Sequence, residues 1–132
     1  MNQTILRLSR SFRFAAALLL IVPAAWAHHS FVAMYDATQT LTAHGTVIEF
    51  SWSNPHSSVD VMTDDQKLMG LELNSPSGLI PAGWKPTTLK PGDKITVRYH
   101  PLREGKAWEE FGQLVDLQTA DGTWLRGGGA AD

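Results

Sequence analysis

The stretch AWAHHSFVAMYD places two adjacent histidines, His28 and His29, directly after a small-residue site that ends at Ala27. If the chain is cut after Ala27, His28 presents a free α-amine and an imidazole, whose ordinary pKa values are about 8 and about 6.5. Both groups lose protons readily at neutral pH, and the backbone amide between the two histidines can also bind Cu(II) once deprotonated. Nitrogen-rich, roughly planar coordination suits Cu(II) above the other divalent first-row ions. The pattern therefore predicts copper binding at a processed N-terminus.

A further histidine supplied by the fold would distinguish a built site from an incidental one, because any chain that begins His-His has some copper affinity. His56 is the first choice, since it follows the Asn54-Pro55 turn, and His100 is the second. Met34 offers a soft thioether, although methionine in a small core is the more common role. Glu72 lies between two leucines, so alternation turns it outward, where a carboxylate beside His56 would orient the imidazole. The predicted metal ligands are His28, His29 and His56, and the additional candidates are His100, Glu72 and Met34.

A face that binds a non-metal ligand is the alternative hypothesis. Trp52 and Asn54 would contact a small molecule, glycan or peptide, together with Trp84 and Trp108. The more common role of such a segment is a rigid turn in which Asn54 bonds its own backbone. An enzyme, for instance a copper oxidase or oxygenase, is less favoured. The spacing defines no proton-transfer pair, and neither a G-x-S-x-G elbow nor a phosphate-binding loop occurs.

The first 27 residues have the three parts of a secretory signal peptide. Three arginines and no acidic residue precede a nine-residue apolar run (14–22), and an A-x-A site ends at Ala27. The run is shorter than the roughly 20 residues that a helix needs to cross a bilayer. We therefore expect cleavage near Ala27 and a periplasmic or secreted product without a membrane span.

Removal of this leader leaves 105 of the 132 residues, with eight basic against 13 acidic side chains, because three of the 11 basic residues leave with it. The resulting net charge near −5 repels phosphate backbones, so nucleic-acid binding is not expected. The chain has no cysteine. An exported domain of this size must then be stabilised by packing, alone or with a bound metal ion or small ligand. The sequence indicates no protein partner.

From Thr40 onward the chain alternates polar and apolar residues as β-strands do. TLTAHGTVIEFSW, SSVDVMT and KLMGLEL predict three strands, with Gly45 at a bulge or sharp coil and a hairpin between the second and third. NSPSGLIPAGWKPTTLKPGD contains four prolines and three glycines, which exclude one long helix. We expect a crossover that packs Leu79, Trp84 and Leu89 against a barrel end. KITVRYH, FGQLVDLQT and TWL predict the remaining strands, the last two joined by a tight ADG turn.

Three strands, a crossover and two or three further strands follow the order of an OB-like barrel. We therefore predict an all-β fold with small α content, an OB-like barrel of five or six strands with an irregular or short helical crossover. A β-sandwich with a similar number of strands is the alternative. The predicted domain plan is a signal peptide at 1–27, an N-terminal arm at 28–39, the barrel at 40–126 and a flexible tail at 127–132.

Four stretches of the chain together resemble a family of small exported bacterial proteins of unknown function: HHSFVAMYD, GTVIEFSWSNPH, LELNSPSGL and LKPGDKITVRYHP. Members of this family begin the mature chain with a His-His-Ser motif and carry a W-x-NPH motif. The likeness spans Ala27 to Leu125 and implies a periplasmic β domain, without implying an activity. The first histidine is also similar to that of copper-dependent polysaccharide oxygenases and some copper carriers, a likeness of one residue. The residues that match the family pattern are His28, His29, Ser30, Trp52, Asn54, Pro55, His56, Glu72, Ser75 and Pro76.

Overall fold

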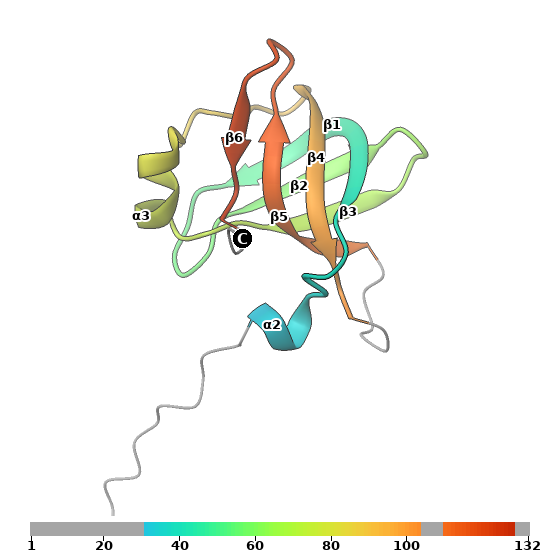
Figure 1. Ribbon diagram of the computed structural model, residues 1–132. Helices are drawn as coiled ribbons and strands as arrows, with labels where there is room; N and C mark the ends of the chain where they lie inside the picture. The colour runs from blue at the N-terminus through green and yellow to red at the C-terminus, as the bar shows by residue number, and fades with distance from the viewer. Residues whose placement is uncertain (1–30, 104–109, 129–132) are drawn as a thin grey trace, which may run out of the picture.

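The computed structural model describes residues 31–103 and 110–128, and for residues 31 and 32 the backbone alone. Most of this part of the chain is β-strand, as the sequence predicts, and the helices are short (Figure 1). None of the helices in these two ranges is long and apolar enough to cross a membrane. The elements in chain order are α2 (Phe31–Met34), β1 (Leu41–Ser51), β2 (Ser58–Thr63), β3 (Leu68–Glu72), α3 (Pro76–Leu79), the 3-10 helix η2 (Ile80–Ala82), β4 (Lys94–Pro101), β5 (Phe111–Gln118) and β6 (Trp124–Arg126).

Five of the strands close into a barrel in the order β1-β2-β3-β5-β4, and β6 adds to the free part of β5. Neighbouring strands are antiparallel except β3 and β5, which run parallel and pair residues 70–72 with residues 111–113. This parallel pair closes the cylinder, whereas the two sheets of a sandwich would keep their edges apart. The predicted OB-like barrel is confirmed, and the sandwich alternative is excluded.

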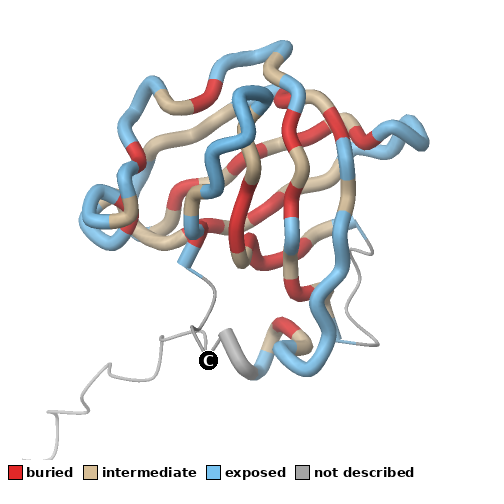
Figure 2. The backbone as a smooth tube through the Cα atoms, turned by 45° about the horizontal axis from the view of Figure 1, so that its top comes forward, coloured by how far each residue is buried: buried red, intermediate tan, exposed pale blue. Residues whose placement is uncertain are grey.

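The core lies inside the barrel, and buried residues alternate with more exposed ones along β2 and the first half of β4 (Figure 2). In β2, Val59 and Val61 are fully buried, while the residues between and beside them are partly exposed. Leu71 of β3 and Leu117 of β5 are also fully buried. The side chains that fill the barrel are therefore those that the alternating pattern predicts.

The crossover between β3 and β4 covers one end of the barrel with α3, η2 and an irregular segment (Figure 1). Leu79, Trp84 and Leu89 are buried and belong to the core, as expected. The indole Nε1 of Trp84 donates a hydrogen bond to the carbonyl oxygen of Arg126 at 2.7 Å. The crossover thus joins the barrel end to the last strand.

Gly45 was expected at a bulge or a sharp coil, and the bulge of β1 lies elsewhere. The register between β1 and β2 shifts at Ile48, whereas Gly45 pairs with both Thr63 of β2 and Ile95 of β4. Gly45 marks the point where β1 passes from one neighbour to the other. A Cβ atom there would lie 2.5 Å from the carbonyl oxygen of Met62. Close backbone approach, rather than a bulge, therefore requires the glycine.

Candidate functional site

Three polar side chains from separate elements meet on the outside of the barrel: Tyr35, Glu72 and His56, here called the polar triad. The Tyr35 hydroxyl donates a hydrogen bond to Glu72 Oε2 at 2.5 Å. His56 Nδ1 lies 3.6 Å from Glu72 Oε1, which is too long for a direct hydrogen bond but within ion-pair distance. One carboxylate therefore links the segment before β1 to the loop before β2.

Strand alternation places Glu72 on the outer surface. Its neighbour Leu71 is fully buried, so Glu72 must turn outward, and it pairs with Ser58 of β2 and Gln113 of β5. The β2–β3 pairing continues one step further, because the Ser57 amide donates to the Asn74 carbonyl at 3.1 Å. His56 precedes this pair and so reaches the same outer surface, diagonal to Glu72.

Tyr35 reaches Glu72 because the arm packs against the ends of β4 and β5. The Asp36 amide donates to the Pro101 carbonyl at 2.8 Å, and Tyr35 forms an isolated β-bridge with Leu102. The Tyr35 ring stacks on Phe111, with ring centroids 6.4 Å apart. Phe111 can lie there because its partner across the seam is Gly70, where a Cβ would be 2.7 Å from the Phe111 ring. Tyr35 thus packs against the seam between β3 and β5, where it contacts Phe111.

The surroundings of Tyr35 affect the protonation of its hydroxyl. Burial raises the pKa of Tyr35 far above its ordinary value of 10.0, and the hydrogen bond to Glu72 and that residue's charge raise the pKa further. Tyr35 therefore remains a hydrogen-bond donor at physiological pH. A carboxylate facing Nδ1 favours the His56 tautomer that carries its proton there, with the lone pair on Nε2.

The His56 side chain is only partly buried. The Nδ1 atom itself is buried, yet 36% of the side-chain surface is exposed. An imidazole with a carboxylate beside one ring nitrogen can bind a metal ion through the other.

His100 and Met34 do not join the triad. His100 is buried, and its Nδ1 donates to the Gln39 carbonyl at 2.7 Å, so it anchors the arm. Gln113 stands between Glu72 and His100 in the sheet, a separation of two strand spacings, about 10 Å. Met34 is half-buried, and its carbonyl accepts a hydrogen bond from the Arg103 amide at 3.0 Å.

The alternative ligand face is not assembled as predicted. Trp84 is only 1% exposed and lies in the core, so no face of its ring is open to a ligand, and it must be removed from that face. Trp52 is half-buried and packs edge-on against Phe50 at 5.9 Å, while Asn54 is exposed in the same loop. These two residues remain at the surface, and Trp108 lies outside the described residues.

The other predicted ligands, His28 and His29, also lie outside the described residues, as does the predicted signal peptide. Within residues 31–103 and 110–128, no three His, Asp or Glu side chains gather closely enough to hold a metal ion. The described part of the chain contributes one partly exposed imidazole with a carboxylate beside it, that of His56.

Tyr35 is the member of the triad that sequence analysis did not single out. It lies 37 residues from Glu72, in an arm without a periodic pattern, so no local spacing connects the two. The available signal was a polar aromatic residue in an otherwise irregular segment, and such residues usually find a hydrogen-bond partner when they are buried.

Comparison with curated proteins and with solved structures found no significant match. A family profile matches residues 17–110, which is more than half of the chain and includes all three residues of the polar triad. The resemblance drawn from the sequence to a family without a known role is thereby confirmed. The chain belongs to a family of unknown function, DUF6152.

Proposed function

We propose that this chain is an exported copper-binding protein in which the fold supplies His56 and a processed N-terminus supplies His28 and His29. The observation that supports the proposal is the polar triad. Histidines that bind metals commonly present their second ring nitrogen to a carboxylate, which fixes the tautomer and makes the ligating nitrogen more basic. Glu72 stands in that position relative to His56, and Tyr35 holds Glu72.

The length of the arm is compatible with a shared site. Tyr35 contacts Glu72, and His28 precedes Tyr35 by seven residues. The four residues of α2 advance the chain by about 6 Å at a rise of about 1.5 Å each. Three further residues reach at most about 10 Å when extended. An amine tethered this closely has a high effective concentration near His56, which would convert a peptide chelate into a stronger site.

The proposed ligands are all nitrogens: the α-amine and imidazole of His28, the imidazole of His29 and Nε2 of His56. Such a set suits Cu(II), and the chain has no cysteine thiolate that would favour softer ions. Export rests on the leader described above. Removal of that leader would also leave a more negative protein, which attracts cations.

Titration of Cu(II) into protein that begins at His28 tests the contribution of the fold. His56→Ala should weaken Cu(II) binding at least about tenfold, since it removes a ligand rather than an outer partner. His44→Ala is the matched control, because His44 is an exposed histidine of β1 bonded to Thr96 and apart from the triad. Glu72→Gln should weaken binding about tenfold while leaving the four nitrogens in place.

Equal Cu(II) affinity for the wild type and His56→Ala would exclude His56 from the site. An N-terminal peptide chelate would then account for all of the binding. A loss of equal size in His44→Ala would show that the effect is not specific to the triad, and would contradict the proposal equally.

A further inference from the structure

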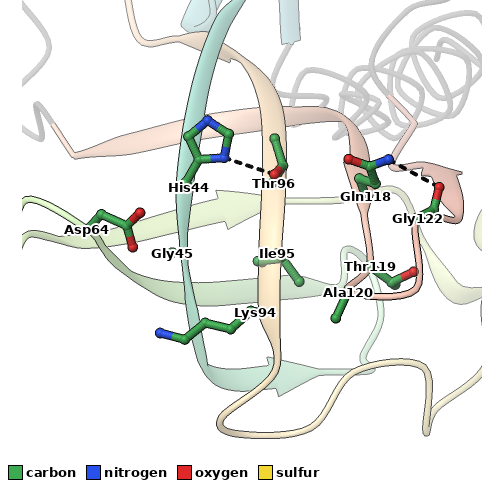
Figure 3. Close-up of a pocket in the computed structure, with 10 residues that line it drawn as sticks. All are labelled: His44, Gly45, Asp64, Lys94, Ile95, Thr96, Gln118, Thr119, Ala120 and Gly122. Atoms are coloured by element: carbon green, nitrogen blue, oxygen red, sulfur yellow. Dashed lines mark hydrogen bonds between the residues drawn. The ribbon is translucent and has the colours of Figure 1, made fainter.

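A polar trough of about 330 Å³ lies on the outer face of the barrel, and none of its lining residues belongs to the polar triad. It crosses β1, β4 and β5 between two hairpin tips. Asp64, beyond the end of β2, stands on one side, and Ala120 and Gly122 of the β5–β6 turn stand on the other (Figure 3). Its volume is at the small end of the range of ligand sites in proteins.

A row of side chains on the outer face of the barrel is here called the outer ladder: His44, Thr96, Gln118 and Trp124. The first three line the trough, and Trp124 follows Gln118 on the next strand. The strand register places His44 opposite Thr96, Thr96 opposite Gln118, and Gln118 opposite Trp124. Directly paired residues point to the same face of a sheet, so the four side chains stand side by side. At about 4.8 Å per strand, the outer ladder is roughly 14 Å long.

The polar members of the outer ladder are held in place before any ligand arrives. His44 Nδ1 and Thr96 Oγ1 are 2.9 Å apart, and Gln118 Nε2 donates to the Gly122 carbonyl at 3.1 Å (Figure 3). Each of these side chains retains further hydrogen-bonding capacity: a second ring nitrogen, a hydroxyl lone pair and an amide oxygen. The outer ladder therefore offers donors and acceptors in fixed positions.

The outer ladder ends at an exposed tryptophan. Trp124 keeps 46% of its surface exposed, and the Arg98 guanidinium lies over its ring, 4.8 Å from the centroid. Arg98 is itself held by Asp116, whose Oδ1 accepts from Nε at 2.6 Å. An indole fixed in this way at the surface is a rigid apolar platform beside a polar trough.

The charges of the trough select the class of ligand. Asp64 and Lys94 contribute opposite charges, and the other polar groups of the lining are hydroxyls, an amide and an imidazole. A balanced lining favours neither anions nor cations. A ligand that matches it needs neutral groups that both donate and accept hydrogen bonds, together with an apolar face for the indole. Sugar rings have both.

We infer that the outer ladder binds a neutral oligosaccharide. Trp124 stacks on the C–H face of one ring, while Thr96 and Gln118 bond the hydroxyls of the next. OB barrels that bind oligosaccharides use the face of their second and third strands and the adjoining loops. The outer ladder lies on β1, β4, β5 and β6 instead, so this surface is separate from that one and from the proposed copper site.

The test is ¹H–¹⁵N spectroscopy of the processed chain during addition of cellotetraose, maltotetraose or chitotetraose. At least one of the three should shift the amide signals of the outer ladder saturably, with a Kd of about 1 mM. Trp124→Ala should weaken that binding at least about tenfold, as expected for loss of a stacking platform. Trp52→Ala, which alters a half-buried tryptophan of the β1–β2 loop, should leave the affinity unchanged.

Thr96→Val is the second variant, because it keeps the shape and strand preference of the side chain and removes only the hydroxyl. It should weaken the same sugar several-fold, since a neutral hydrogen bond is worth about 1 kcal/mol. No saturable shift with any of the three sugars would overturn the inference. Shifts centred on the β1–β2 loop, or equal affinity for the wild type and Trp124→Ala, would do the same.

Discussion

Tyr35→Phe removes one oxygen atom from the polar triad and leaves the stacking on Phe111 in place. The lost hydroxyl is that of a residue only 1% exposed, and it donates to a carboxylate at 2.5 Å. Hydrogen bonds to charged groups are worth about 1.5–3 kcal/mol. Because 22% of the Glu72 side chain is exposed, water can replace part of the interaction. We expect the free energy of unfolding at pH 7 to fall by about 2 kcal/mol.

At high pH the free energy of unfolding of Tyr35→Phe should approach that of the wild type. Burial and Glu72 raise the pKa of Tyr35 above 10.0 in the folded chain, so above pH 10 the unfolded chain releases a proton that the folded chain keeps. The stability contributed by the neutral hydroxyl is complete below pH 10 and is lost as the pH rises beyond it. At pH 11 the wild type should lose about 1.4 kcal/mol in this way, a loss that Tyr35→Phe cannot show.

Urea unfolding at pH 7, 10 and 11, followed by tryptophan fluorescence, measures the difference in the free energy of unfolding between the wild type and Tyr35→Phe, here called the gap. The gap should narrow from about 2 kcal/mol to below about 1 kcal/mol between pH 7 and pH 11. Burial also raises the pKa of Tyr99, the second tyrosine of the chain, but Tyr99 is present in both proteins and cancels in the comparison. A gap that stays constant up to pH 11 would refute the account of a neutral Tyr35 held by burial and Glu72.

Four further substitutions test the barrel by urea unfolding. Leu71→Ala should cost about 2–5 kcal/mol, since Leu71 is fully buried, whereas Leu68→Ala, at a residue 51% exposed, should cost less than about 0.5 kcal/mol; similar costs would contradict the inward and outward assignment of β3. Gly112→Ala places a Cβ 2.5 Å from the Tyr99 ring and 3.0 Å from the His100 carbonyl oxygen at the parallel seam, and should cost about 1–3 kcal/mol. A neutral Gly112→Ala would show that the seam is looser than described. Trp84→Phe removes the indole donor to Arg126 as well as core volume and should cost about 2 kcal/mol; an unchanged midpoint would contradict its place in the core.

The barrel could be predicted because its strands repeat with a period of two. Alternation places Val59 and Val61 on the same face of their strand, which is the buried one, and the prolines and glycines after β3 marked the crossover. The parallel seam between β3 and β5 was not predicted, because no local pattern shows which distant strands pair; the order of elements indicated only an OB-like barrel. The register shift at Ile48 was missed for the same reason, since a bulge depends on the partner strand.

The site was predictable only in part. Alternation turned Glu72 outward, and the hypothesis of a carboxylate beside His56 followed from it and agrees with the 3.6 Å separation. Tyr35 could not be found, because its contact spans 37 residues and depends on how the arm packs against the seam. Trp84 was predicted both on a ligand face and in the core under the crossover, because the sequence does not show how deeply a tryptophan side chain is buried. The outer ladder depends on cross-strand register alone.

The central claim is that a free N-terminal histidine and His56 form one copper site. The most direct measurement compares Cu(II) dissociation constants for protein that begins at His28 and for the same protein with its α-amine acetylated. Acetylation removes the α-amine as a ligand and leaves the imidazoles in place, so affinity at least about tenfold weaker is expected in the acetylated protein. Equal dissociation constants for the two proteins would contradict it.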